Sequence, residues 1–137
     1  MGSPKLVPEL GCSNIERSLK FYTEILGFEV LYARPEEGFA YVSRDGAELM
    51  LDQVGDRPWT TAELTHPYGR GMNLQIEVAD VQRLYATVQA SGAPIYLALE
   101  DKWYRRDQVL VGNRQFIVLD PDGYFLRFAE DLGERPV

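Results

Sequence analysis

Residues 13–28, Ser-Asn-Ile-Glu-Arg-Ser-Leu-Lys-Phe-Tyr-Thr-Glu-Ile-Leu-Gly-Phe, carry the strongest structural signal in the sequence. Its first four residues can cap a helix, because Ser13 and Glu16 stand at capping-box spacing and Asn14 is itself a good N-cap. Gly27 stands where a helix commonly ends in the left-handed conformation. Apolar side chains recur between these two signals at helical spacing, at Ile15, Leu19, Tyr22, Ile25 and Leu26. The pattern therefore predicts an amphipathic helix that ends before Gly27.

Short strands flank this helix, and the same order of elements returns in the second half of the chain. Lys5–Cys12 is expected to be a strand, and three more are expected near 28–34, 38–44 and 47–53, separated by turn residues. In the second half a strand is expected at Gly71–Val78, followed by a helix that Asp80 caps and Gly92 ends. The remaining strands are expected near 94–99, 115–120 and 124–130. The last two are joined by the turn Asp120-Pro121-Asp122-Gly123.

This internal repeat predicts an α+β protein. We expect residues 1–137 to form a single domain of two βαβββ modules, about 5–53 and 71–130. The modules are expected to form a curved mixed sheet with a central cleft and with the helices on its outer face. Two long loops are predicted, near 54–70 and at an insertion near 100–114, and loops of that length are usually functional or mobile.

Alternation along the predicted strands separates an apolar face from a mixed one. The apolar face, which includes Leu6, Leu51 and Phe128, is expected to pack under the helices. The other face carries acids, amides, one Met and one Arg; its members include Glu9, Glu48, Met50, Asp52, Asn73, Gln75, Glu77 and Arg127. Alternation alone leaves open whether this face is simply solvated, but two modules joined by their open faces would enclose it as a polar cleft.

Composition excludes several classes of function. The 137 residues carry 14 Lys and Arg against 21 Asp and Glu, a net charge of −7, which argues against a nucleic-acid partner. No apolar run approaches the ~18 residues of a membrane span. The single cysteine, Cys12, allows neither an intrachain disulfide nor a cysteine zinc site within one chain, which suits a reducing cytoplasm.

Residues 13–28, with a Phe-Tyr pair before Leu-Gly-Phe, and the hairpin Asp120-Pro121-Asp122-Gly123-Tyr124 resemble the glyoxalase / bleomycin resistance / extradiol dioxygenase family, the vicinal oxygen chelate superfamily. The resemblance spans nearly the whole chain and implies the paired-module fold. It also implies where a metal would be held in the family's enzymes, at Val7, Met50, Asn73 and Arg127. None of these residues is His, Asp or Glu, so we expect no metal, no other cofactor and no catalytic residue.

The resemblance then points to the family's drug-sequestering branch, closest to the metal-free bleomycin resistance proteins. It implies a homodimer that holds a cationic glycopeptide antibiotic in clefts between its subunits and performs no chemistry on it. An acidic cleft attracts such a ligand, and aromatic walls add apolar area and cation–π contacts. The expected ligand-binding residues are Glu9, Phe39, Tyr41, Met50, Trp59, Asn73, Gln75, Trp103, Tyr104 and Arg127. Trp59 is expected in the first long loop, and Trp103 and Tyr104 in the second.

Alternatives stay open at this point. Arg127, with Arg105, Arg106 and Arg114 near it in sequence, could instead hold an anionic metabolite. An enzyme could use a shifted metal site among the carboxylates of the mixed face, or acid–base chemistry by Glu9 or Glu48. The only histidine, His66, lies in a predicted loop with no second histidine nearby. A dimeric scaffold without a ligand is a third interpretation.

Overall fold

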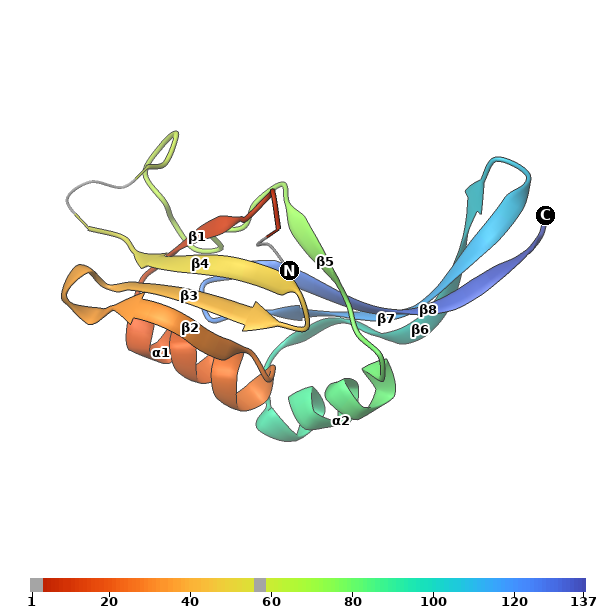
Figure 1. The fold of residues 1–137 in the computed structure, drawn as a ribbon, viewed down its shortest axis with the longest axis horizontal. Helices are drawn as coiled ribbons and strands as arrows, with labels where there is room; N and C mark the ends of the chain where they lie inside the picture. The colour runs from red at the N-terminus through yellow and green to blue at the C-terminus, as the bar shows by residue number, and fades with distance from the viewer. Residues whose placement is uncertain (1–3, 56–58) are drawn as a thin grey trace. The chain divides into compact units, whose positions relative to one another are not determined.

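The computed structural model describes residues 4–55 and 59–137 (Figure 1). The chain divides into two compact units. The first contains the chain up to Arg70 together with Pro121–Tyr124, and the second contains Gly71–Asp120 and Phe125–Val137. Each unit holds one four-stranded mixed sheet and one helical segment, which confirms the predicted α+β class and the two βαβββ modules.

The first unit contains β1 (Glu9–Cys12), α1 (Ile15–Lys20), β2 (Glu29–Arg34), β3 (Phe39–Arg44) and β4 (Ala47–Gln53). Its sheet has the order β1-β4-β3-β2, with β1 parallel to β4 and the other pairs antiparallel. A π-helical segment, η1 (Phe21–Ile25), continues α1, and a 3-10 turn, η2 (Pro35–Glu37), separates β2 from β3.

The structure confirms Asn14 as the N-cap of the first helix and Gly27 as the residue that ends the helical segment. Asn14 is the N-cap, and its side chain accepts a hydrogen bond from the backbone N–H of Arg17 at 3.0 Å. Gly27 has a φ of 79°, so it ends the helical segment in the left-handed region. The first strand is shorter than predicted: it begins at Glu9 rather than Lys5, and Pro8, which has no N–H to donate to a ladder, directly precedes it.

The second unit contains β5 (Asn73–Glu77), α2 (Val81–Ser91), β6 (Ile95–Arg106), β7 (Val109–Leu119) and β8 (Phe125–Pro136). The sheet order β5-β8-β7-β6, with β5 parallel to β8, repeats the arrangement of the first unit. Asp80 caps α2 by accepting a hydrogen bond from Arg83 N at 3.1 Å, and Gly92 ends it with a φ of 79°.

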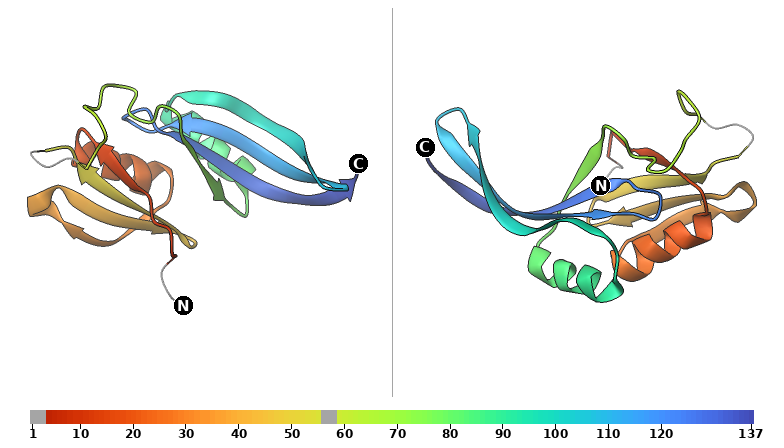
Figure 2. Two further views of the ribbon diagram at one scale, coloured as in Figure 1. Left: turned by 90° about the horizontal axis from the view of Figure 1, so that it is seen from above. Right: turned by 180° about the vertical axis from the view of Figure 1, so that it is seen from behind.

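The prediction of a long loop near 100–114 is wrong. Strands β6 and β7 continue through it as a paired hairpin, with Glu100 opposite Gln115 and Arg106 opposite Val109. The strands turn at residues 107–108, where Asp107 adopts a positive φ of 57°, a conformation that Asp tolerates. β8 also runs past the predicted end near 130, so three strands extend beyond β5 and α2 as a curved ribbon (Figures 1 and 2). The insertion in the repeat favoured a loop, but Trp103, Tyr104, Val109 and Val111 are typical strand residues.

Each helix covers the apolar face of its own sheet (Figure 2). In the first unit Leu51, Tyr22 and Leu26 are fully buried, and in the second Val88 and Phe128 are. Leu6, which we expected in the core, is 83% exposed because it precedes the first strand. Within the described residues no helix is long and apolar enough to cross a membrane.

The turn between β7 and β8 belongs to the first unit, where its buried carboxylate bonds to the start of α1. Asp122 is 1% exposed and accepts hydrogen bonds from the backbone N–H and the hydroxyl of Ser13, at 3.1 and 2.6 Å. Arg17 reaches the same carboxylate at 3.3 Å, and the Tyr124 hydroxyl donates to Gly11 O at 2.9 Å. Pro121–Tyr124 therefore completes the first unit from a distant part of the sequence.

Replacing Asp122 with Asn is expected to lower the free energy of unfolding by about 1–3 kcal/mol, because an amide cannot accept from all of these donors in a buried position. Asp45→Asn is the matched control: Asp45 is an exposed turn residue with a positive φ, which Asn also tolerates. It should change stability by less than about 0.5 kcal/mol. Urea unfolding followed by circular dichroism measures the free energy of unfolding of both variants. Equal losses would contradict a special role for the buried Asp122 carboxylate.

Candidate functional site

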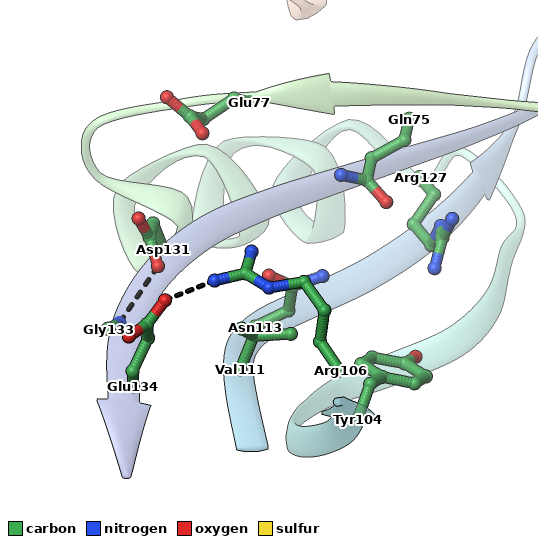
Figure 3. A pocket seen from close by; sticks show the side chains of 10 residues that line it. All are labelled: Gln75, Glu77, Tyr104, Arg106, Val111, Asn113, Arg127, Asp131, Gly133 and Glu134. Atoms are coloured by element: carbon green, nitrogen blue, oxygen red, sulfur yellow. Dashed lines mark hydrogen bonds and ion pairs between the residues drawn. The ribbon is translucent and has the colours of Figure 1, made fainter. Parts of the chain in front are cut away.

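The second unit contains a cavity of about 550 Å³ on the face of its sheet that α2 does not cover (Figure 3). Gln75 and Glu77 on β5 and Arg127 on β8 point to this face, while the alternating Ile76, Leu126 and Phe128 are buried on the other. The cavity is lined by Gln75, Glu77, Tyr104, Arg106, Val111, Asn113, Arg127, Asp131, Gly133 and Glu134.

The strand register explains how distant residues meet here. Gln75 lies opposite Arg127 in the parallel pair of β5 and β8. The ribbon of β6, β7 and β8 supplies the rest, with Tyr104 opposite Val111 and Val111 opposite Glu134. Because β5 ends at Glu77 while β8 continues, the ribbon forms a wall of the cavity beyond the end of β5.

Arg127 brings a buried polar atom without a hydrogen-bond partner among the described residues to this cavity. This atom is its Nε, which donates to no acceptor in residues 4–55 and 59–137. Within the described residues none of the ion pairs involves Arg127. Gln75, its partner in the register, places an amide beside it (Figure 3). A guanidinium with a free buried donor can bind an acceptor group of a ligand in a planar, directional way.

The opposite end of the cavity carries acidic groups. Arg106 forms an ion pair with Glu134, and Asp131 accepts a hydrogen bond from the backbone N–H of Gly133 at 2.8 Å. Glu77 lines the same end (Figure 3). This end can attract a positively charged part of a ligand.

Tyr104 is held in place by a hydrogen-bonded chain behind the cavity. The amide nitrogen of Gln115 donates to the Tyr104 hydroxyl at 2.7 Å and to Glu100 at 3.2 Å. Gln115 itself is 2% exposed, so it cannot relax easily. The ring of Tyr104 is thereby presented to the cavity as an oriented apolar surface.

The ten residues expected to bind a ligand do not all gather in this cavity. Gln75, Tyr104 and Arg127 line it, whereas Asn73, also on β5, does not. Trp103 is in β6 rather than in a loop, and it stacks against the guanidinium of Arg135 at 4.0 Å. Trp59 is 89% exposed and lies outside any helix or strand.

The other four expected residues share the mixed face of the first unit's sheet. Glu9 and Tyr41 both lie opposite Met50 in the strand register, and Phe39 lies opposite Asp52. Aromatic rings meet on this face: the ring of Tyr41 stacks on that of Tyr32 at 5.1 Å. The guanidinium of Arg34 lies 4.0 Å from the centre of the Phe39 ring.

Two groups on this face have shifted pKa values. Burial raises the pKa of the Glu9 carboxyl. A hydrogen bond with Asp52 and the negative charge of Asp52 raise this pKa further, and the positive charge of Arg34 partly opposes the shift. A hydrogen bond to Glu48 raises the pKa of the Tyr41 hydroxyl to about 12. The Tyr41 hydroxyl donates a hydrogen bond to Glu48 and keeps its own proton more firmly than a free tyrosine does.

Replacing Asp52 with Asn should lower the pKa of Glu9, because it removes the neighbouring negative charge. Arg34→Gln should raise it, because the opposing positive charge is lost. Stability should fall as pH rises from about 4.5 to the folded-state pKa of Glu9, since the folded protein binds the proton more tightly there. Carboxyl NMR titration measures both shifts, and shifts in the same direction would contradict this electrostatic account.

Several cavity residues were not predicted, because a loop was expected at 100–114 and the last strand was expected to end near 130. Val111, Asn113, Asp131, Gly133 and Glu134 belong to strand segments that were not predicted. The signal was present: alternation along 103–106 places Tyr104 and Arg106 on one face and Trp103 on the other.

The donor groups do not fit the metal that the family's enzymes hold. Val7 has no donor atom and precedes β1, and Arg127 cannot coordinate a cation. Met50 and Asn73 offer a thioether and an amide, a soft and a hard donor that no single metal prefers. Among residues 4–55 and 59–137, no group of three or more His, Cys, Asp or Glu side chains could hold a metal ion.

Paired βαβββ modules with a polar cavity against one sheet define a class of small-molecule-binding folds rather than one activity. The model of the Glyoxalase/Bleomycin resistance protein/Dioxygenase superfamily matches residues 7–128, and the chain belongs to this superfamily.

Bleomycin resistance proteins of Geobacillus stearothermophilus and Staphylococcus aureus are 25% identical to the chain over 135 residues. The match covers 92% of this chain and 96% of each relative. The structure of TioX from Micromonospora sp. ML1 is similar with 26% identity and a TM-score of 0.70, over 95% of this chain and 100% of TioX. A superfamily protein from Alicyclobacillus acidocaldarius, 18% identical with a TM-score of 0.65 over 93% of this chain and 90% of its own, shows the same fold.

Proposed function

We propose that the protein is a metal-free binding protein that sequesters a bleomycin-type glycopeptide antibiotic in the cytoplasm. The single observation that carries the proposal is the second-unit cavity, in which acidic side chains and the ring of Tyr104 face the same space. The likeness to bleomycin resistance proteins along nearly the full chain supports the same class of ligand. Sequestration needs only binding, so it requires neither a metal nor a nucleophile.

The acidic end of the cavity suits the cationic tail of such an antibiotic. Glu77 and Asp131 have no basic partner among the described ion pairs, so their charge is available to a ligand. The net charge of −7 adds a long-range attraction for a cation and speeds its encounter with the protein. The flat aromatic part of the antibiotic would gain apolar contact with Tyr104.

We also propose a homodimer, in which the ligand lies in a cleft shared between two subunits. The exposed ribbon supports this idea, because three strands that extend past their helix leave a large surface without a partner in one chain. Glu9, Phe39, Tyr41, Met50, Trp59, Asn73 and Trp103 are proposed to contribute to that cleft alongside the cavity residues. Sedimentation equilibrium is expected to give twice the mass of one chain, and a single-chain mass at micromolar concentration would contradict the dimer.

Isothermal titration of the chelator-treated protein with metal-free bleomycin tests the main proposal. Saturable binding of about one drug per subunit is expected, and prior dialysis against a chelator should not change the affinity. An absence of binding, or affinity that returns only when a divalent metal is restored, would contradict metal-free sequestration.

The double variant Glu77→Gln, Asp131→Asn should weaken bleomycin binding about tenfold, which corresponds to about 1.4 kcal/mol. Both substitutions keep the shape of the side chain, and the amide oxygen introduced by Asp131→Asn can still accept from the N–H of Gly133. The matched control, Glu36→Gln with Glu37→Gln, removes the same charge from an exposed 3-10 turn outside the cavity. An equal loss in both double variants would show that only net charge matters.

A further inference from the structure

The cavity of the second unit has two ends of opposite character, and only the acidic end is explained by a cationic ligand. In Figure 3, Arg127 and Gln75 lie at one end, and Glu77 and Asp131 lie at the other. Arg106, near the middle of this view, reaches toward Glu134, which lies beside Asp131 at the acidic end. A cation alone would leave the Arg127 end without a partner.

The guanidinium of Arg127 indicates which kind of ligand group would fit that end of the cavity. Its buried Nε–H has no acceptor in the part of the chain that the structure describes, and a buried donor without an acceptor is costly. The nearest residue in the register, Gln75, carries a neutral amide that cannot balance the charge of a guanidinium. Because Nε and one terminal nitrogen form a planar fork, a carboxylate can accept from both at once. A neutral carbonyl would accept at one oxygen and leave the charge unbalanced.

We propose that this end of the cavity is a carboxylate-binding site, and that the protein binds small aromatic carboxylates through Arg127. The carboxylate pairs with the guanidinium, the Gln75 amide donates to one of its oxygens, and the aromatic body lies against Tyr104. The proposal rests on the proposed role of the cavity as a ligand site. It adds a ligand class that the antibiotic does not represent.

Tyr104 and its support suit the body of such a ligand. The chain from Gln115 to the Tyr104 hydroxyl holds the ring on β6, and Val111, opposite it on β7, adds an apolar side chain to the lining. A volume of about 550 Å³ is within the range of cavities that hold small organic molecules.

The test compares 2-naphthoate with its neutral isostere 2-naphthamide, each titrated into the wild-type protein. We expect naphthoate to bind at least tenfold more tightly. We also expect the Arg127 Nε–H resonance to shift on adding naphthoate but not on adding naphthamide. Equal affinities, or an Arg127 resonance that does not respond, would overturn the proposal without any variant being made.

Arg127→Gln should abolish the preference for naphthoate, and Arg127→Lys should retain only part of it because the planar fork is lost. The matched control is Arg114→Gln, which removes the same charge from a two-bond pair with Asp101 outside the cavity lining. Arg114→Gln should keep the full preference. A preference that survives in folded Arg127→Gln would overturn the assignment.

These outcomes separate the two proposals. If bleomycin binds and naphthoate does not, the carboxylate-site proposal is contradicted and the antibiotic proposal is supported. If naphthoate binds through Arg127 and bleomycin does not, the carboxylate site stands and the antibiotic proposal falls.

Discussion

The buried carboxylate of Asp122 is the interaction on which the first unit depends. It bonds to Ser13, 109 residues earlier in the chain, through both the backbone N–H and the hydroxyl. Ser13 directly precedes the N-cap of α1, so the carboxylate anchors the link between β1 and the helix to the β7–β8 turn. Because Asp122 is 1% exposed, water cannot replace these bonds. The hairpin turn of the second module is thus a structural part of the first.

The two modules share a fold but present different chemistry on their open faces. The face of the first unit carries paired carboxylates, Glu9 and Asp52, beside stacked tyrosine rings. The second unit has Arg127 on its open face, and its longer strands line a cavity. Two additions distinguish this unit: residues inserted into the β6–β7 hairpin lengthen β6 and β7, and β8 continues to Pro136. The strands β2, β3 and β4 of the first unit are 6, 6 and 7 residues long, too short to form such a wall.

Much of the fold could be predicted because local signals agree with the tertiary structure. Asn14, Asp80, Gly27 and Gly92 set the limits of the helical segments through backbone chemistry that needs no distant partner. The ribbon could not be predicted with the same success, since its charged residues are stabilised by partners across the strands, such as Arg114 with Asp101. The cavity residues were predicted only in part, because several of them lie on the ribbon. Gln75 and Arg127 follow from alternation on predicted strands, but Asp131 and Glu134 depend on strand pairing beyond the predicted end.

The long separation between Ser13 and Asp122 also constrains how the protein is made. A nascent chain can form the β2–β3 and β3–β4 hairpins early, since their contacts are local, whereas β1 must wait for β4 because Glu9 pairs with Met50. The Ser13 donors and the Gly11 carbonyl reach their protein partners only after Asp122 and Tyr124 have been synthesised. The first unit therefore stays incomplete until the turn that precedes β8 has been made.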